Sequence, residues 1–188
     1  MNTVYTGDKV RLRPFMGMDE WLWLIAHEDR EPNEHWGLWF CSQIELRKEF
    51  EKNGLMLTDD YSVFAVEHLT SGECIGYEEY GGSKPGRPSD WVGTFIRKEF
   101  RRQGCGVEAK LLNLCHLFEN FPLNVVFADT TETHERAQRG LELSGMKRCG
   151  VRRKAHYFKG RFVDIPQYYI LRSDWEQMEY RHKVQRGM

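Results

Sequence analysis

Short segments of alternating apolar and polar residues mark the strands expected in the first half of the chain. Residues 10–15 alternate apolar with basic side chains and carry Pro14, which predicts a first strand at the edge of a sheet. Residues 62–67 and 74–80 are rich in β-branched and aromatic residues, and a Thr-Ser-Gly turn at 70–72 lies between them. We therefore predict a hairpin of two antiparallel strands.

Two helices are expected between the first strand and this hairpin. Asp19 can cap one of them, and Ser42 with Glu45 forms a capping box at the start of the second, which should cover residues 43–52. Glycine and proline then cluster over residues 81–89, which predicts a loop. This loop would border the active site if the strand that follows it is the central one.

The second half of the chain begins with a strand over residues 92–96 and a helix over residues 107–118. The apolar residues of this helix recur at helical spacing and predict one buried face, made of Val107, Leu111, Leu114, Cys115 and Phe118. His116 lies outside that apolar stripe, so we expect it to be a surface residue rather than a ligand.

The remaining elements continue the alternation of strand and helix. We predict a strand over residues 123–128, and then a helix that Thr133 caps and Gly145 ends. A last hairpin should turn at residues 159–160 and return as far as Leu171. The seven histidines show no metal-ligand spacing, so no metal is expected.

Composition fits a single domain over residues 1–188, with residues 176–188 as a C-terminal tail. Aromatic residues make up thirteen per cent of the chain, which excludes a disordered protein. The five cysteines are scattered, with no C-x-x-C pair, which is typical of a reduced intracellular protein. No apolar stretch approaches the roughly 20 residues that span a bilayer. We therefore expect a cytoplasmic protein with no membrane association.

Charge is unevenly distributed along the chain. Residues 1–100 carry 11 basic and 18 acidic side chains, a balance of −7, whereas residues 147–188 carry 11 and 4, a balance of +7. Such a division could indicate an acidic partner. The positive charge is spread through the predicted strands without a long run, however, which argues against nucleic acid.

The most informative stretch is the basic turn between the strand at 92–96 and the helix that follows. Arg101 and Arg102 precede Gly104 and Gly106, so backbone N–H groups and the positive end of a helix meet beside basic side chains. This arrangement suits an anion. No Gly-Lys-Ser/Thr follows, which excludes a Walker-type nucleotide loop, and no third glycine completes a dinucleotide fingerprint. A simpler interpretation is that the glycines only allow the chain to turn.

The order Ile-x-x-x-x-Arg-x-x-Gly-x-Gly over residues 96–106 resembles the acyl-coenzyme A (CoA) signature of the GNAT superfamily of acetyltransferases. Residues 141–146 resemble that family's Leu-x-x-x-Gly-Phe segment, with Met146 for Phe. Residues 160–175 are similar to the ending of the ribosomal-protein alanine acetyltransferase branch. The resemblance implies an α/β fold with a mixed, mostly antiparallel sheet of about seven strands, a splayed central parallel pair and about four flanking helices.

The resemblance also implies where acetyl-CoA binds. Backbone groups between the splayed strands would hold the pantetheine arm, Gly93 would be a bulge residue, and the thioester would lie beside Thr94 and Phe95. An unpaired N–H near Phe95 could stabilise the oxyanion. The implied cofactor-binding residues are Thr94, Phe95, Ile96, Arg101, Arg102, Gln103, Gly104, Cys105, Gly106, Val107 and His134.

Acyl transfer to an amine also needs a base, and three candidates follow from the resemblance. Family members carry Glu or His six residues before the position of Ile96, which corresponds to Asp90 here. Asp90 could equally end a loop in a turn. Glu79, at the end of the neighbouring strand, is the next candidate, and His35 is the third.

The family places two helices on the acceptor side, so residues 19–57 are expected to form the substrate pocket. They include an aromatic stretch from which we select His35, Trp36 and Trp39 as substrate-binding residues. The alternative for this stretch is a hydrophobic lid over the core.

Two positions depart from the family pattern. His134 stands where many members have Asn, and Leu141 stands where a Tyr often protonates the departing thiolate. The resemblance therefore implies an N-acetyltransferase that acts by direct transfer from acetyl-CoA to a primary amine of a small molecule or of a peptide N-terminus. The alternative is a CoA-binding regulatory module that has lost its chemistry. Both a monomer and a homodimer are compatible with the sequence.

Overall fold

The computed structural model describes residues 4–26, 43–55, 61–81 and 91–187. Every strand and helix predicted above falls on one of its elements. The elements in chain order are β1 (Val4–Thr6), β2 (Val10–Arg13), α1 (Met18–Ala26), α3 (Gln43–Asn53), β3 (Tyr61–His68), β4 (Cys74–Gly81), β5 (Trp91–Ile96), η1 (Lys98–Phe100), α4 (Cys105–Asn120), β6 (Val125–Asp129), α5 (Glu135–Leu143), β7 (Lys147–Phe158), β8 (Arg161–Leu171), α6 (Arg172–Glu176), η2 (Glu179–His182) and β9 (Gln185–Gly187).

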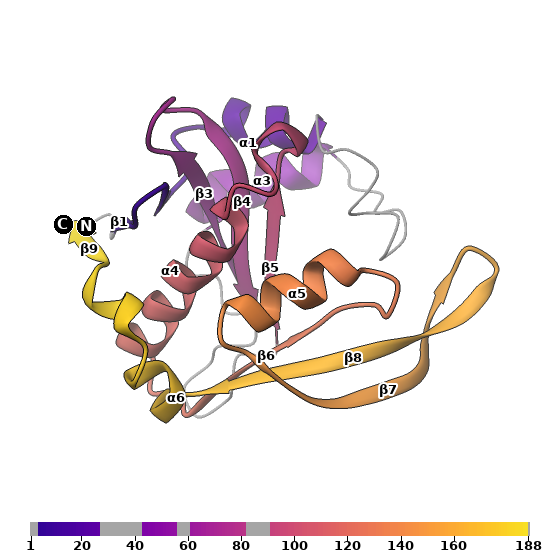
Figure 1. Ribbon diagram of the computed structural model, residues 1–188. Helices are drawn as coiled ribbons and strands as arrows, with labels where there is room; N and C mark the ends of the chain where they lie inside the picture. The colour runs from indigo at the N-terminus through magenta and orange to yellow at the C-terminus, as the bar shows by residue number, and fades with distance from the viewer. Residues whose placement is uncertain (1–3, 27–42, 56–60, 82–90, 188) are drawn as a thin grey trace.

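The strands form two antiparallel sheets that meet at β5 and β6 (Figure 1). One sheet has six strands in the order β5-β4-β3-β2-β1-β9, and the other has three in the order β6-β8-β7. Strands β5 and β6 each end their own sheet and lie next to each other, with α4 as the connection between them. Within the described residues no hydrogen-bonded ladder joins these two strands. The expected mixed α/β fold with a sheet that divides at its centre is confirmed.

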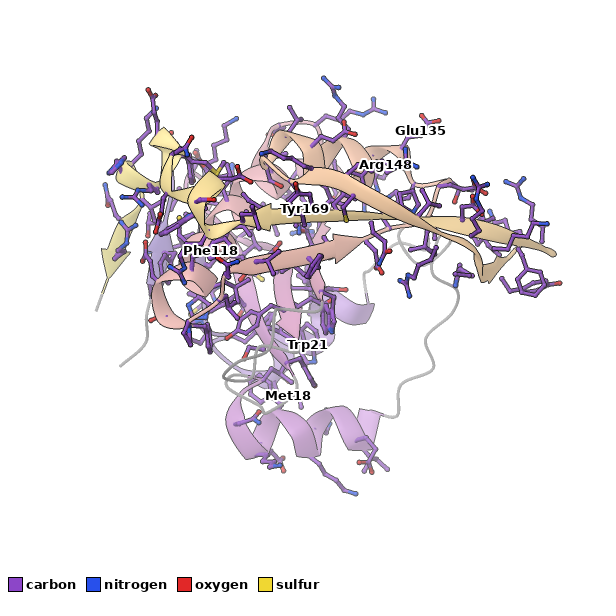
Figure 2. The ribbon with its side chains drawn as sticks, turned by 90° about the horizontal axis from the view of Figure 1, so that it is seen from below. Met18, Trp21, Phe118, Glu135, Arg148 and Tyr169 are labelled. Atoms are coloured by element: carbon purple, nitrogen blue, oxygen red, sulfur yellow. The ribbon has the colours of Figure 1, made fainter. Side chains whose placement is uncertain are left out.

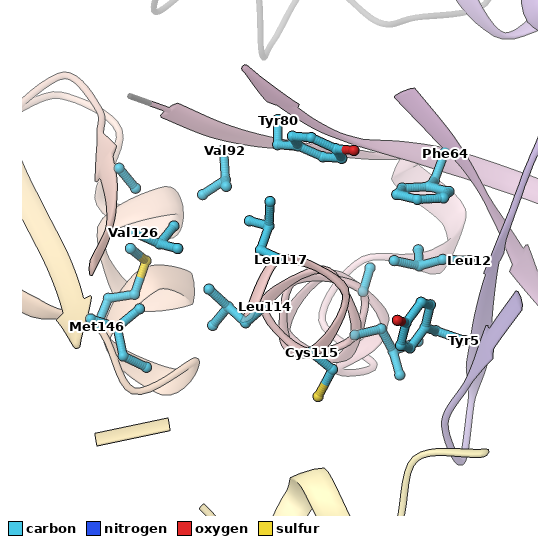
Figure 3. Packing of buried hydrophobic residues seen from close by; sticks show 14 of the residues in the cluster. Tyr5, Leu12, Phe64, Tyr80, Val92, Leu114, Cys115, Leu117, Val126 and Met146 are labelled. Carbon is cyan, nitrogen blue, oxygen red and sulfur yellow. The ribbon is translucent and has the colours of Figure 1, made fainter. Parts of the chain in front are cut away.

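Helix α4 lies at the centre of the hydrophobic core. In Figure 3 it lies between Tyr80 and Val92 of the six-stranded sheet on one side and Val126 and Met146 on another. The residues that these contacts bury are Cys105, Glu108, Ala109, Lys110, Leu112, Asn113, Leu114, Cys115, His116, Leu117 and Phe118. They occupy nearly all sides of the helix, so the prediction of one buried face is too narrow. It is also partly wrong, because Val107 and Leu111 are only half-buried.

His116 is buried, and the prediction of a surface position is wrong. Its side chain is 6% exposed, and its ring lies 4.9 Å from that of Phe64, edge to face. The Tyr80 hydroxyl is 3.1 Å from Nε2, and Asn120 Nδ2 is 3.3 Å from Nδ1. Burial lowers the pKa of His116 to about 4, so the ring is neutral at pH 7. Polar partners within the core make this position possible for an imidazole.

The opposite face of the six-stranded sheet is covered by α1 and α3 (Figure 1). Trp21 of α1 lies between this helix and the strands (Figure 2), with its ring 5.0 Å from Phe15 and 5.5 Å from Tyr77. Phe50 of α3 packs against the same small cluster. The sheet therefore has two cores, a large one around α4 and a smaller one under α1 and α3.

Arg13 joins α1 to the sheet through an ion-pair network that sequence reasoning did not identify. Its guanidinium is 2.7 Å from Glu20 of α1, and its Nε donates to Glu67 of β3. Arg11 pairs with the same Glu67 carboxylate. Burial opposes ionisation of Glu67, but hydrogen bonds from Arg13 and Arg11 hold its pKa below the ordinary value.

Three predictions about boundaries need correction. The strand at residues 10–13 is not an edge strand, because β1 pairs with it on the side away from β3. Residues 176–187 are not a free tail, because they form η2 and then β9, where Gly187 pairs with Val4 of β1. His134 rather than Thr133 is the N-cap of α5, while Gly145 follows this helix in the predicted left-handed conformation, with φ of 86°.

Candidate functional site

The turn from β5 into α4 leaves a helix N-terminus without a side-chain cap. Gly104 is the N-cap residue of α4 and has a left-handed backbone with φ of 88°, which favours glycine. The first helical hydrogen bond runs from the Glu108 N–H to the Gly104 carbonyl, 3.0 Å away. The N–H groups of the three residues before Glu108 precede this bond and have no acceptor in the helix. N–H groups in this position suit a ligand with negative charge.

The side chains of the turn point in different directions. Arg101 folds back onto β5, where its Nε donates to the Ile96 carbonyl at 2.7 Å. The Gln103 amide donates to the Glu99 carbonyl at 2.9 Å, while Arg102 is exposed. Cys105 is buried at 1% exposure and belongs to the core rather than to the surface of the site. The arginines and Gln103 thus enclose the turn, and Cys105 anchors it.

Lys9, in the connection between β1 and β2, brings a further positive charge to the turn. Its Nζ donates to the Gln103 carbonyl at 2.5 Å, and a Cβ at Gly104 would lie 2.9 Å from it. The buried Glu108 carboxylate holds the segment before β2 in place by accepting from the N–H groups of residues 8–10 at 2.7–3.0 Å. Sequence reasoning missed Lys9, because only the packing of the β1–β2 connection against α4 brings it to this turn.

The outer edge of β5 presents backbone groups on the side away from β4. The Arg97 N–H donates to the Ile75 carbonyl at 2.8 Å, which fixes the direction of alternate residues along the strand. Gly93 and Phe95 therefore pair with β4, and the backbone groups of Thr94 and Ile96 face outwards toward β6. These are the groups that an added extended chain would bind. Phe95 is thus flanked by two outward N–H groups, those of Thr94 and Ile96.

Glu79 lies over Gly93 on the face of the sheet that α1 and α3 cover. A Cβ at Gly93 would lie 2.5 Å from Glu79 Oε1 and 2.8 Å from its Cγ, so only glycine leaves room for this carboxylate. Phe95 stacks on Tyr77 on the same face, with ring centroids 5.3 Å apart. The register between β4 and β5 is continuous at Gly93, so the prediction of a bulge there is wrong. The physical reason for this glycine is space for a side chain.

Glu78 points to the other face and is completely buried. Its Oε1 accepts from Lys110 Nζ at 3.2 Å and from Asn113 Nδ2 at 3.1 Å, both on α4. Thr94 lies opposite Glu78 in the register of the two strands, while the buried Oε2 of Glu78 has no hydrogen-bond partner among the described residues. Burial raises the pKa of Glu78 although Lys110, Thr94 and Asn113 oppose the shift. Sequence reasoning missed this cluster. The signal was a Lys and an Asn three residues apart, next to Leu111, Leu112 and Leu114.

The remaining predicted residues fall into two groups. His134 begins α5, and Leu141 on the same helix is 4% exposed within the core. An apolar side chain in that position cannot donate a proton. The other four candidates, Asp90, His35, Trp36 and Trp39, lie outside the described residues. Within the described part of the chain no group of three or more His, Cys, Asp or Glu could hold a metal ion, and no helix is long and apolar enough to cross a membrane.

Several solved structures of acetyltransferases share this fold. Spermidine N-acetyltransferase from Vibrio cholerae, in complex with CoA and spermine, is 19% identical, with a TM-score of 0.77 over 89% of this chain and 98% of its own. RimJ from Mycobacterium smegmatis, in complex with CoA-disulfide, is 18% identical, with a TM-score of 0.75 over 96% and 92%. RimL, a ribosomal L7/L12 alpha-N-protein acetyltransferase in complex with CoA, is 14% identical, with a TM-score of 0.73 over 87% and 94%.

At the level of sequence, no curated protein matches the chain. The acetyltransferase (GNAT) domain family matches residues 9–147, which include the turn, the outer edge of β5 and the whole of α4. This match spans well over half of the chain. The protein therefore belongs to the GNAT family and is an acyl-CoA-dependent acetyltransferase.

Proposed function

We propose that the protein is an N-acetyltransferase that moves an acetyl group from acetyl-CoA directly to a primary amine of a small molecule or of a peptide N-terminus. The observation that carries this proposal is the continuity between two binding surfaces. The outward backbone groups of Thr94 and Ile96 lead straight to the uncapped N-terminus of α4 at Gly104. An amide-rich arm that ends in phosphates matches this order of groups.

The turn would bind the phosphates of acetyl-CoA. Its glycines fit that task, because a Cβ at Gly104 would lie 2.9 Å from the Lys9 ammonium and one at Gly106 would lie 3.3 Å from Ile96 Cγ1. Side chains there would separate the helix from the strand or fill the turn. Lys9 and Arg102 would add positive charge beside the phosphates. Arg101 would have to release the Ile96 carbonyl for the pantetheine arm to pair with it.

The thioester would lie beside Thr94 on the outer edge of β5. The outward N–H groups of Thr94 and Ile96 are the candidate donors to the oxyanion that forms when the amine attacks the carbonyl carbon. Loss of one such donor costs about 3 kcal/mol in other acyl-transfer enzymes. Phe95 and Cys105 would support the site through packing rather than through polar contact.

The amine must lose a proton, and two carboxylates are the candidates to accept it. Glu79 lies on the face covered by α1 and α3, one strand away from Thr94. Asp90 immediately precedes β5 in sequence. We propose that Asp90, acting through a water molecule, or Glu79 is the base, and that residues 19–57 with His35, Trp36 and Trp39 bind the acceptor.

The two kinds of acceptor have precedent among the structural neighbours. One of them is a spermidine acetyltransferase in complex with spermine, and another is a ribosomal protein acetyltransferase. We also infer that the enzyme acts in the cytoplasm. Its described cysteines, Cys74, Cys105, Cys115 and Cys149, are free thiols, which suits a reducing compartment.

The test is release of free thiol from acetyl-CoA when the purified protein is incubated with polyamines, amino-sugar compounds and N-terminal peptides in parallel. We expect release that depends on one class of amine and that is lost in Gly106→Val. A second candidate function, a CoA-binding module without chemistry, is favoured by the apolar Leu141. Binding of acetyl-CoA without thiol release in the presence of any amine would support that module and contradict our proposal.

A further inference from the structure

The hairpin of β7 and β8 is strongly basic and extends beyond the other described elements (Figure 1). Residues 147–171 contain seven basic side chains and one acidic one, a balance of +6, in a chain whose total is −1, so the rest of the chain carries −7. All seven basic residues are exposed. They are Lys147, Arg148, Arg152, Arg153, Lys154, Lys159 and Arg161. The hairpin thus gathers on one surface the cations that are spread along the sequence.

Strand β7 is the outer strand of the three-stranded sheet. Among the described residues no strand pairs with it on the side away from β8. None of its twelve residues is buried. An edge strand of this length presents a row of backbone N–H and C=O groups to which an extended chain can add. Basic side chains protect such an edge against its own copies, because like charges on neighbouring strands repel each other, but they attract an acidic strand.

A bulge in β7 presents two of these cations. The register between β7 and β8 shifts at residues 153–155, which lie opposite Asp164 alone. Asp164 Oδ1 accepts from the backbone N–H of Lys154 at 2.8 Å, and its Oδ2 lies 3.9 Å from the Arg153 guanidinium. The Arg153 side chain nevertheless remains 86% exposed. The one acid of the hairpin therefore holds the bulge, and both cations remain available to an acidic partner.

An exposed aromatic pair lies near the end of the hairpin. Tyr157 and Phe162 face each other across the two strands, with ring centroids 5.2 Å apart, and they are 61% and 62% exposed. Aromatic and arginine side chains are the types enriched at protein interfaces. A strand that was only protected against its own copies would have no need of these rings. Together with the cations they form a surface that suits both the acidic and the apolar side chains of a partner.

The distribution of charge favours a polypeptide over a nucleic acid as this partner. Nucleic acid carries a negative charge at each phosphate along its whole length. A strand that extended past the hairpin would meet the rest of the molecule, which carries −7, and would be repelled. A short acidic polypeptide segment can bind within the hairpin. Its backbone N–H and C=O groups also match the edge of β7, which a sugar-phosphate backbone cannot do.

We propose that β7 is the docking site for an acidic, extended segment of a partner protein, which adds to the three-stranded sheet as a further strand. The carboxylates of this segment bind the cations at the bulge and along the hairpin, and an apolar residue packs on Tyr157 and Phe162. The inference goes beyond the proposed function and does not depend on acetyl transfer.

The first test measures, by fluorescence anisotropy, the binding of a fluorescein-labelled peptide of alternating glutamate and valine with the length of β7. We expect Arg153→Glu and Arg161→Glu each to weaken binding at least tenfold, about 1.4 kcal/mol, because each replaces an attraction with a repulsion. Lys183→Glu is the matched control, since it makes the same change of charge at an exposed residue after η2, outside the hairpin. It should keep the wild-type affinity. An equal loss in all three variants, or no binding to the wild type, would overturn the inference.

The second test locates the bound peptide by hydrogen–deuterium exchange. An added strand accepts hydrogen bonds from the N–H groups on the outer edge of β7, so their exchange should slow when the wild type is saturated with peptide. The N–H groups of β9, at the far end of the six-stranded sheet, are the internal control and should exchange at an unchanged rate. Unchanged exchange throughout β7 in the saturated protein would contradict the addition of a strand.

Competition with other anions tests the class of partner. Single-stranded oligothymidylate and phosphatidylglycerol vesicles carry negative charge but no peptide backbone, so we expect each to displace the labelled peptide far less well than the unlabelled peptide does. Displacement by either as effective as that by the unlabelled peptide would show a general anion site and overturn the inference. The free energy of unfolding of each variant identifies a poorly folded protein. Because these assays contain no acetyl-CoA, their failure and the failure of the proposed function are distinguishable.

Discussion

Two neighbouring glutamates of β4 have opposite environments. Glu78 points toward α4 and is completely buried, whereas Glu79 points toward α1 and α3 and is half-buried over Gly93. The alternation of side chains along a strand is sufficient to separate them. Glu78 therefore needs Lys110 as a partner, and Glu79 needs a glycine on the next strand.

This difference gives the two faces of one sheet different chemistry. Burial raises the pKa of Glu78, whereas Glu79 is only half-buried. The proposed thioester position at Thr94 lies between the two faces. The comparison therefore predicts that changes on the Glu79 side affect transfer to the amine and that changes on the Glu78 side affect the stability of the core.

The largest expected effect is on the acceptor face. Removal of a general base lowers turnover by roughly 10²- to 10⁴-fold, so Asp90→Asn or Glu79→Gln should lower kcat with little change in the KM for acetyl-CoA. The loss should be greatest for an amine of pKa about 10.4 and smaller for an α-amine near 7.7 to 8. Steady-state kinetics at pH 7 on both amines is the measurement. If both variants turn over the high-pKa amine at the wild-type rate, the base does not lie on this face.

On the opposite face, Lys110→Met should destabilise the protein by about 3–5 kcal/mol, because it leaves Glu78 buried without its cation. The pKa of Glu78, already raised, would then rise further. The unfolded state releases that proton more readily, so the loss of stability should grow as pH increases through the folded pKa. Urea unfolding at several pH values measures this effect.

A matched control for this change is Lys48→Ala. Lys48 pairs with Glu45 at 2.9 Å on α3, but both side chains are about two-thirds exposed. Such surface pairs contribute roughly 0–1 kcal/mol. A loss in Lys110→Met as small as that in Lys48→Ala would show that the buried pair is not needed for folding.

His116 on α4 should also make the stability of the protein depend on pH. Its pKa falls from 6.5 to about 4 on folding, chiefly through burial and against the influence of Glu119. Between pH 6.5 and 4, His116 therefore binds a proton in the unfolded chain but not in the folded one. The folded protein loses stability as the pH falls through this range. The full effect is about 3 kcal/mol. His116→Gln should flatten this part of the stability profile, and an unchanged slope would assign the acid sensitivity to other groups.

The smallest expected effect concerns the glycine that brings α4 close to β5. Gly106→Val should weaken acetyl-CoA binding at least tenfold, about 1.4 kcal/mol, because a Cβ there already lies 3.3 Å from Ile96. Titration calorimetry measures the affinity, and an unchanged circular dichroism spectrum shows that the fold is intact. Gly17→Ala is the control, since nothing lies within 4 Å of its Cβ position. If Gly106→Val and Gly17→Ala bind acetyl-CoA with equal affinity, the turn is not part of the acetyl-CoA site.

The sequence predicted the parts of the site that are local. The turn at Gly104 and the left-handed Gly145 were both found, because glycine is required by the backbone conformation of a few adjacent residues. The hairpin turn at Lys159-Gly160 was found for the same reason, with positive φ at both positions.

Features that depend on contacts between distant residues could not be predicted. The contact of Glu78 with Lys110 depends on strand register and on the rotation of α4, which no short pattern specifies. The prediction from the apolar spacing was wrong for His116, because α4 is buried on nearly all sides. In such a helix the spacing of apolar residues no longer separates buried from exposed positions. Gly93 suggested a bulge, although its purpose is space for Glu79 on the next strand.

The most direct test of the whole account is a crystal structure of the protein with CoA bound. We expect the phosphates on the N–H groups that follow Gly104, the pantetheine amides on the outward backbone of Thr94 and Ile96, and the sulfur beside Thr94. Arg101 should have released the Ile96 carbonyl. CoA bound away from β5, or an Ile96 carbonyl still bonded to Arg101 beneath the bound ligand, would contradict it.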